Sequence, residues 1–257
     1  MSSFDRNDLG WSSCFSSVFD SLNQSGLVPA RVARAERERY LLMHECGVSQ
    51  AVLAGRLRHE SPGVGALPVV GDWVAARTGD SFDLAAGHTA QTPAGLLPGA
   101  ARIEVILPRR TLLTRNDPSL GGTRQPLAAN VDLVLLAAGL DHDFNPRRLE
   151  RGAALAWEAG AEPVVVLTKA DLRPGWRNEL TRVMAAVPGA HTLACSARTG
   201  QGMDELGGLL APGVTAVLLG SSGTGKSTLV NRLLGVDRQG TGHVREADSR
   251  GRQATTH

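Results

Sequence analysis

Lysine is almost absent from this sequence of 257 residues: Lys169 and Lys226 are the only lysines among its 27 lysine and arginine residues. Arginine therefore supplies the positive charge wherever any cation suffices. A retained lysine indicates a site that needs a slim ammonium group on a flexible stem, which a planar guanidinium cannot replace. We therefore expect both lysines to be functional.

Paired cysteines, long apolar runs and a strong net charge are also missing. Cys14, Cys46 and Cys195 stand apart without a C-x-x-C pair, which favours a reduced protein over one with disulfides or a thiolate metal site. No run of about 18 apolar residues predicts a membrane span, so we expect a cytoplasmic protein with no membrane partner. The formal charge of +2 is too small to indicate a polyanionic partner by itself.

The first half of the sequence predicts a polar leader and a small β domain. Residues 1–26 are rich in serine and predict a flexible leader. Residues 27–115 contain short β-type runs separated by glycine and proline clusters, at 28–44, 48–59, 69–77 and 103–115. Such a pattern favours a closed β-barrel of the OB type, although another small β module stays open.

From residue 116 to 257 the pattern changes to alternating strands and helices. Apolar runs at 131–138, 164–167, 191–195 and 214–219 predict strands. After Pro146, a helix is predicted in which Leu149, Ala153, Ala156 and Trp157 share one face, and another helix is predicted at 180–187. Repeated βα units predict a parallel sheet covered by helices, with its ligand at the carboxyl ends of the strands.

A glycine-rich motif follows the last of these strands. It matches G-x-x-x-x-G-K-[ST] and comprises Gly220, Ser221, Ser222, Gly223, Thr224, Gly225, Lys226 and Ser227, with Thr228 next. An apolar helix pattern follows it, which is the context that a phosphate-binding P-loop requires. We expect the backbone N–H groups to surround the phosphates, Lys226 to reach the terminal phosphates and the Ser227 hydroxyl to hold Mg²⁺.

Two further motifs indicate which base is bound. The tetrapeptide Thr168, Lys169, Ala170, Asp171 follows the strand at 164–167, and the Asp171 carboxylate can accept two hydrogen bonds from guanine, whereas adenine leaves that charge unpaired. We expect Lys169 to lay its stem along the base and to brace the P-loop with its ammonium group. Ser196 and Ala197, which follow the third strand, can offer a backbone N–H to the guanine carbonyl.

The order of these motifs is unusual, because the base-reading motif precedes the P-loop. A parallel sheet whose natural ends lie close together can be cut and rejoined elsewhere without losing its core. The sequence therefore predicts a circularly permuted GTPase (G) domain over residues 116–257. An ATP-dependent kinase or transporter is the competing interpretation, and it requires selectivity for adenine.

With its barrel, T-K-x-D, S-A, P-loop and G-R-x-x-T-T-H segments, the sequence resembles the ribosome small-subunit-dependent GTPases of the RsgA or YjeQ type from about residue 27 onward. The resemblance implies slow hydrolysis of GTP to GDP, stimulated by the small ribosomal subunit, contact between the barrel and ribosomal RNA, and a role in late subunit maturation. We expect a monomer. A nucleotide-gated RNA-binding module without turnover stays open as an alternative.

The resemblance also assigns the segment Gly251–His257 to the first switch. There it implies that Thr255, with Thr256 close behind, completes the Mg²⁺ shell. Gln253 stands where the family usually has histidine and is the candidate for orienting the attacking water. Gly223 replaces an asparagine that binds a monovalent cation in some permuted GTPases, so we expect no potassium ligand there.

The sequence ends at His257, before the family's D-x-x-G strand and its zinc domain. We therefore expect a truncated chain, without zinc ligands, that binds nucleotide weakly and hydrolyses it poorly, and whose P-loop strand has an exposed edge.

Arginines are frequent in the barrel region, where they either neutralise RNA phosphates or belong to a solvated surface with Glu36, Glu38 and Glu60. They are Arg31, Arg34, Arg37, Arg39, Arg56, Arg58, Arg109, Arg110 and Arg115.

Overall fold

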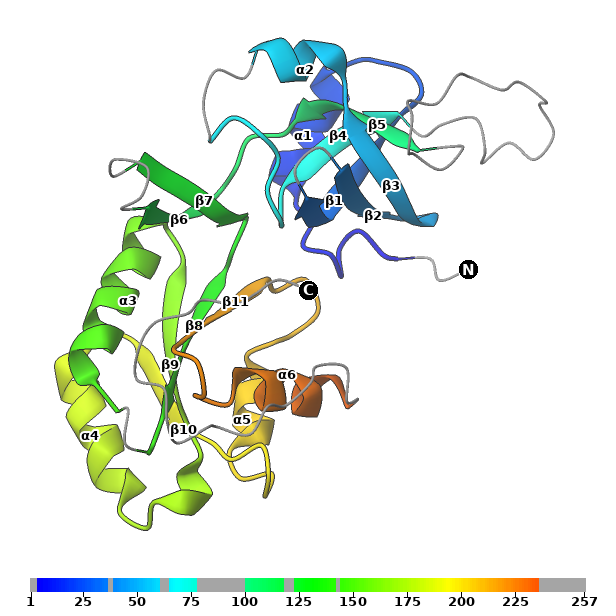
Figure 1. The fold of residues 1–257 in the computed structure, drawn as a ribbon. Helices are drawn as coiled ribbons and strands as arrows, with labels where there is room; N and C mark the ends of the chain where they lie inside the picture. Colours follow the sequence, from blue (N-terminus) through cyan, green and yellow to red (C-terminus); the bar gives the residue numbers. More distant parts are fainter. Residues whose placement is uncertain are drawn as a thin grey trace.

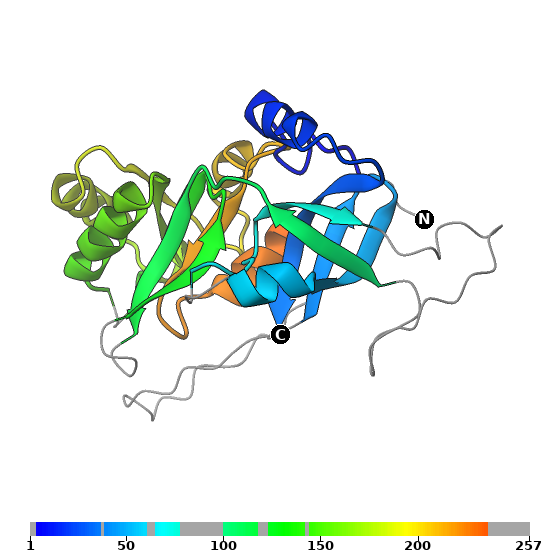
Figure 2. The same ribbon diagram turned by 90° about the horizontal axis from the view of Figure 1, so that it is seen from above.

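The structure is a computed structural model that describes residues 4–36, 39–60, 65–77, 100–117, 123–141 and 144–235. Two lobes follow each other along the chain, a β-barrel and an α/β domain (Figure 1). Seen from above, they lie side by side (Figure 2). Within the described ranges, no helix is both long and apolar enough to cross a membrane.

The first lobe is a closed five-stranded barrel in the order β1-β2-β3-β5-β4. Its strands are β1 (Leu27–Glu36), β2 (Arg39–His44), β3 (Gly47–Leu53), β4 (Trp73–Arg77) and β5 (Ala101–Ile106), and α2 (Gly55–Glu60) follows β3. Strands β3 and β5 pair in parallel, and the other neighbours pair antiparallel. Alternate residues of β2, such as Tyr40 and Leu42, point into the barrel core. The predicted OB-like barrel is confirmed.

Three of the predicted β runs divide differently. The run at 48–59 contains β3 and then the helix α2. The run at 28–44 forms the two strands β1 and β2, and the run at 103–115 contains β5 and then β6 (Leu112–Asp117). Strand β6 does not join the barrel but pairs with β7 (Thr123–Ala129) in a two-stranded sheet. The barrel strands therefore end at Ile106, before the predicted boundary at 115.

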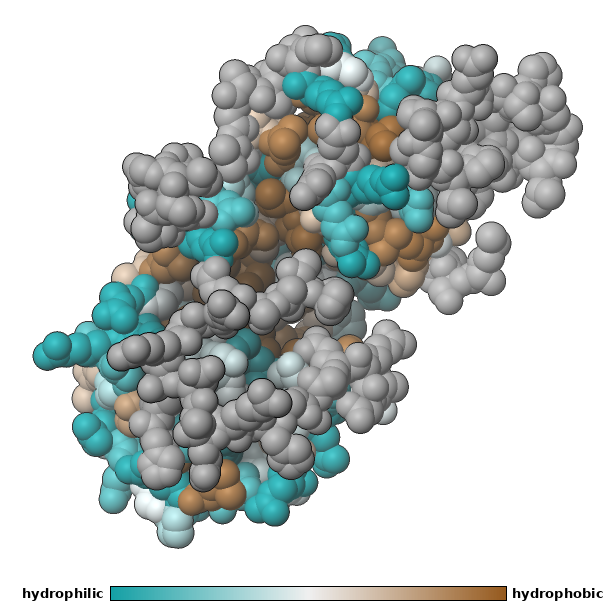
Figure 3. All heavy atoms as spheres, viewed as in Figure 1, coloured by the Kyte–Doolittle hydropathy of each residue, from teal (hydrophilic) through white to brown (hydrophobic). Residues whose placement is uncertain are grey.

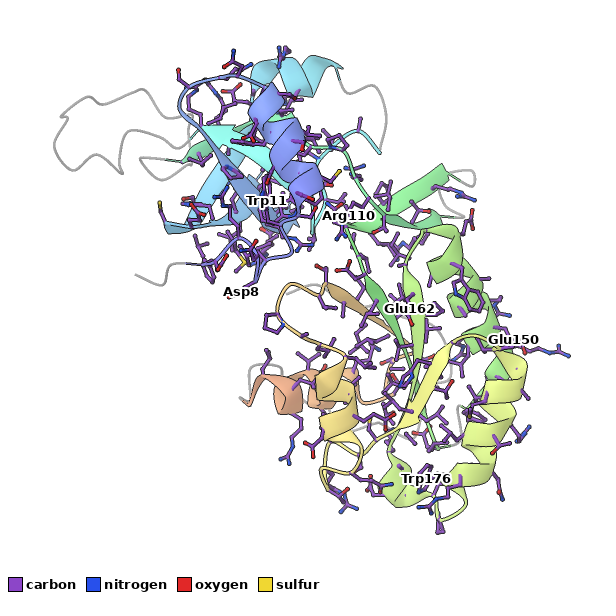
Figure 4. The ribbon with its side chains drawn as sticks, turned by 180° about the vertical axis from the view of Figure 1, so that it is seen from behind. Asp8, Trp11, Arg110, Glu150, Glu162 and Trp176 are labelled. Atoms are coloured by element: carbon purple, nitrogen blue, oxygen red, sulfur yellow. The ribbon has the colours of Figure 1, made fainter. Side chains whose placement is uncertain are left out.

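The leader differs from the expected flexible segment. Residues 13–21 form helix α1 (Ser13–Ser21), which buries Phe15 against Trp73 and Leu107. Trp11, labelled in Figure 4, stacks edge-on against Trp73 with 4.7 Å between ring centroids. The aromatic residues of the leader thus cover the barrel, whereas Ser13, Ser17 and Ser21 of the same helix are exposed.

The second lobe is a parallel sheet in the order β10-β9-β8-β11. Its strands are β8 (Leu133–Gly139), β9 (Glu162–Thr168), β10 (His191–Ala194) and β11 (Ala216–Leu219), with helices α3 (Pro146–Glu158), α4 (Trp176–Ala186), α5 (Met203–Gly208) and α6 (Lys226–Leu234). Within the described sheet, β11 is an edge strand, as expected. The predicted α/β P-loop architecture is confirmed.

Successive residues of β9 enter two different cores, one on each face of the sheet. Val165 and Leu167 pack in the cluster that includes α3 and α4, whereas Val164 and Val166 pack in the cluster that includes α5 and α6. This alternation explains why the strand reads as a continuous apolar run. On α3, Trp157 was predicted to be on the buried face, but it is 47% exposed, because it lies at the margin of that face. Figure 3 shows hydrophilic residues over the outer side of α3 and α4.

Two arginines of the barrel region have partners inside the structure. Arg31 of β1 is buried and donates to the carbonyl oxygens of Leu9 and Asn130, and its burial lowers its pKa to about 10. Arg109 donates through Nε and Nη2 to the two carboxylate oxygens of the fully buried Asp72, at 2.8 Å each. These two arginines have structural partners, so the suggestion that they neutralise RNA phosphates is wrong for them.

Arg110 is connected through Asp132 to the start of β11, the strand that precedes the P-loop. It lies where the lobes meet (Figure 4) and pairs with Asp132 at 3.0 Å. The other Asp132 carboxylate oxygen accepts a hydrogen bond of 2.8 Å from the backbone N–H of Thr215. The leader reaches the same place, since Gly213 N–H donates to the carbonyl of Asp8 at 3.0 Å. The start of β11 is thus fixed to the barrel.

Candidate nucleotide-binding site

The P-loop connects β11 to α6 at the carboxyl end of the sheet. Glycine is required at Gly225, whose φ is +85°, and at Gly220, where a Cβ would lie 2.5 Å from the carbonyl oxygen of Ala137. Lys226 Nζ donates to the carbonyl oxygens of Gly220 at 2.9 Å and Ser221 at 2.6 Å. Its ammonium group therefore bends back over the loop, and burial lowers its pKa.

The T-K-x-D turn contacts this loop from β9, across the end of β8. Thr168 is buried, and its hydroxyl donates to the carbonyl oxygen of Thr224 at 2.5 Å. Lys169 has φ +60°, and a Cβ on Gly225 would lie 4.0 Å from its Cε. The predicted meeting of the two motifs is therefore seen, although β8 separates their strands. The Lys169 ammonium group pairs with Asp141 at 2.5 Å rather than with a P-loop carbonyl.

Asp171 lies in the short turn that follows, beside the S-A segment. Its Oδ1 accepts a hydrogen bond of 2.5 Å from the Ser196 hydroxyl, and its Oδ2 accepts two from Arg198, at 2.9 Å from Nε and 2.6 Å from Nη2. The Ser196 hydroxyl, followed by Arg198, lowers the pKa of this carboxyl group. Asp171 is therefore ionised at neutral pH, as an acceptor of base N–H groups must be.

The loop after β10 holds Ser196 in place. Ser196 is buried, and its N–H donates to the carbonyl of Gln201 at 2.9 Å. The N–H of Ala170 donates to the carbonyl of Cys195 at 3.1 Å, which ties the two base-side turns together. Because the Ser196 amide is used within its own loop, Ala197 is the better candidate for donating an N–H to a base.

The cysteines offer a test of this packing. Burial raises the pKa of Cys195 to about 11, so its thiol is protonated and shielded at pH 8, whereas Cys14 and Cys46 are exposed. We expect two thiols to react quickly with a disulfide reagent in the native protein and the third only after denaturation, because the thiolate is the nucleophile. Rapid labelling of Cys195 in the native protein, located by peptide mass mapping, would contradict the buried position.

A cavity of about 330 Å³ lies beside the P-loop, between β8 and α3. Its wall includes Ser221 and Thr224 of the loop and Leu149 of α3. Arg148, at the start of α3, donates to the Ser221 hydroxyl. Arg148 belongs to no sequence motif, but its place just after Pro146, at a helix start near the carboxyl end of β8, is a signal for a residue of this site.

Of the predicted metal and switch residues, the structure describes Ser227 but not those of the first switch. Ser227 lies in the first turn of α6, next to Lys226, so its hydroxyl is at the phosphate end of the site. Thr255 and Gln253 lie outside the described residues. Within the ranges that the structure describes, no group of three or more His, Cys, Asp or Glu side chains could hold a metal ion.

A sequence model described as RsgA GTPase matches residues 106–257, which is more than half of the chain. The protein belongs to the RsgA GTPase family. A relative from Opitutus terrae, named small ribosomal subunit biogenesis GTPase RsgA, is 43% identical over 98% of this chain and 66% of its own length. A relative of the same name from Syntrophotalea carbinolica is 40% identical over 97% of this chain and 65% of its own. The chain thus spans about two thirds of these RsgA proteins.

Two solved structures share the fold. YjeQ from Thermotoga maritima has a TM-score of 0.60 at 24% identity, over 80% of this chain and 65% of its own. YloQ, titled a circularly permuted GTPase, has a TM-score of 0.55 at 19% identity, over 81% of this chain and 64% of its own. The predicted circular permutation is confirmed, since the base-side turn precedes the P-loop in the chain and meets it at one end of the sheet.

Proposed function

We propose that this RsgA-family protein binds GTP, hydrolyses it to GDP and phosphate, and acts in late maturation of the small ribosomal subunit in the cytoplasm. The hydrogen bond between Thr168 and the carbonyl of Thr224 carries the nucleotide-binding part, because it joins a guanine-type base motif to a phosphate loop. The names of the relatives support the ribosomal part.

In this proposal, each motif binds one part of the nucleotide. Asp171 accepts the N–H groups of guanine, Ser196 orients that carboxylate, and the Ala197 N–H faces the base carbonyl. The residues that form the turn carrying Asp171, beside the base, are Thr168, Lys169 and Ala170. The phosphates lie against the backbone of Gly220, Ser221, Ser222, Gly223, Thr224 and Gly225, with Lys226 on the terminal phosphates and Ser227 and Thr228 at the helix start.

The chemistry is in-line attack of water on the γ-phosphorus, which breaks the bond to the β-phosphate oxygen. Mg²⁺ bound with the nucleotide would neutralise phosphate charge, and the hydroxyls of Ser227 and Thr255 are the hard oxygen ligands that suit it. Lys226 balances the charge on the terminal phosphates, and Gln253 orients the water. The roles of Gln253 and Thr255 in this proposal rest on the sequence resemblance, because both residues lie outside the described ranges.

We also propose that the barrel contacts ribosomal RNA and that the protein acts as a monomer. Four arginines of the barrel are exposed, in contrast to Arg31 and Arg109, which have partners inside the structure. They are Arg34, Arg39, Arg56 and Arg58. Arginines on a nucleic-acid-binding fold can neutralise phosphates, which supports an RNA contact at this surface.

Single-turnover cleavage of GTP, with and without purified small ribosomal subunits, tests the proposal. We expect slow cleavage that the subunit accelerates, and a loss of roughly 100-fold or more in Lys226→Ala, because one charge-stabilising donor to the reacting phosphates is removed. Cleavage of ATP at the same rate, or GTP cleavage that small subunits leave unchanged, would contradict the proposal.

A further inference from the structure

Arg198 contacts the same carboxylate oxygen that the proposed base site needs. Its Nε and Nη2 both donate to Asp171 Oδ2, at 2.9 and 2.6 Å, while Ser196 holds Oδ1. The side chain of Asp171 is 11% exposed, whereas that of Arg198 is 72% exposed. The arginine therefore covers the carboxylate from the solvent side and is free to swing away.

The donors of Arg198 resemble those of guanine. A guanidinium presents two neighbouring N–H groups on one carbon, and the N1–H and 2-amino groups of guanine form the same array. Both arrays fit a carboxylate acceptor. Adenine lacks this pair of donors, because the ring nitrogen beside its amino group is an acceptor, so it matches the place of the arginine at Oδ2 less well.

We infer that Arg198 mimics the edge of guanine and competes with it for Asp171, so that a guanine nucleotide binds only by displacing this side chain. The inference rests on the proposed function. Arg198 lowers the affinity for GDP and GTP alike, because the competition concerns the base and not the phosphates. When the base leaves, Arg198 takes its place on the carboxylate and opposes rebinding.

The size of the effect follows from the exposure of the pair. Exposed ion pairs of this kind contribute modestly, so removing Arg198 is expected to tighten GDP binding about threefold. Salt screens such a pair, so the difference between the variant and the wild-type protein shrinks at about 1 M salt. If Arg198 acted only through its positive charge, its removal would weaken the binding of every nucleotide, because nucleotides are anions.

Titration of the full chain with GDP and with ADP tests the inference, in the wild-type protein, Arg198→Ala and Arg232→Ala. Arg232 is the matched control, since its guanidinium lies near Gly200 of the same loop but does not bond to Asp171. We expect Arg198→Ala to bind GDP about threefold more tightly and ADP no more tightly, and Arg232→Ala to show no tightening.

Unchanged or weaker GDP binding in Arg198→Ala would overturn the inference, and so would equal tightening for GDP and ADP. Those outcomes leave the proposed function standing as long as the wild-type protein prefers GDP. If the wild-type protein shows no preference for GDP over ADP, the proposed function fails and the inference fails with it.

Discussion

Asparagine in place of Asp171 is expected to shift the preference of the site from GDP to xanthosine diphosphate. The carboxylate accepts two N–H groups of guanine in the proposed complex, and an amide offers one acceptor and one donor instead. Xanthine presents an N1–H beside a carbonyl oxygen, which matches that pattern. Hydrogen bonds to charged groups contribute about 1.5–3 kcal/mol, so we expect GDP affinity to fall roughly 10- to 100-fold while affinity for the xanthine nucleotide rises.

Competition between the two diphosphates in equilibrium binding measures this shift. Asp204→Asn is the matched control, because Asp204 is exposed in the first turn of α5. This substitution removes the same charge at a position away from the base-side turns. We expect Asp204→Asn to keep the preference for GDP. If Asp171→Asn binds GDP as the wild-type protein does, Asp171 does not read the base.

Alanine in place of Arg109 is expected to lower the free energy of unfolding by about 3–5 kcal/mol. Arg109 is 17% exposed and neutralises Asp72, whose side chain is completely buried. It also donates to the carbonyl oxygens of Gly65 at 2.7 Å and Leu67 at 2.8 Å. Without the guanidinium, a buried carboxylate loses its partner, which is among the most destabilising single changes.

Chemical denaturation of two further variants separates this cause from a general loss of charge. Arg102→Ala removes an arginine that is 55% exposed and pairs with Glu104 at 2.6 Å, so we expect a change of less than about 1 kcal/mol. Asp72→Ala combined with Arg109→Ala removes both charges and should be less destabilising than Arg109→Ala alone. A double variant that is as unstable as the sum of the two single ones would contradict the pairing.

The sequence predicted the parts of the site that depend on local geometry. Gly220 occupies a position where a side chain would clash, and Gly225 one where the backbone has a positive φ. The spacing of glycines in the sequence predicts both requirements, because only glycine meets them without cost. The continuous apolar runs of β9 and β11 likewise follow from strands that helices cover on both faces. The motif spacing and the strand pattern together were enough to predict that Thr168 and Lys226 lie at the carboxyl edge of the same sheet.

The errors concern side chains whose partners are distant in the chain. The leader looked unstructured because its serines outnumber its aromatic residues, but Phe15 packs against Trp73. Arg109 looked like a surface cation because Asp72, its partner, lies 37 positions earlier. Arg198 gave no signal, since nothing in the residues around it shows that its guanidinium lies on Asp171.

The central claim is that Asp171 and the P-loop hold the two ends of one guanine nucleotide. A crystal structure of the GDP complex tests it most directly. We predict that the N1 and 2-amino nitrogens of guanine lie about 3 Å from the Asp171 carboxylate, while the β-phosphate sits inside the loop from Gly220 to Ser227 beside the Lys226 ammonium group. A complex in which the phosphates occupy that loop but the base lies away from Asp171, or the reverse, would contradict the account.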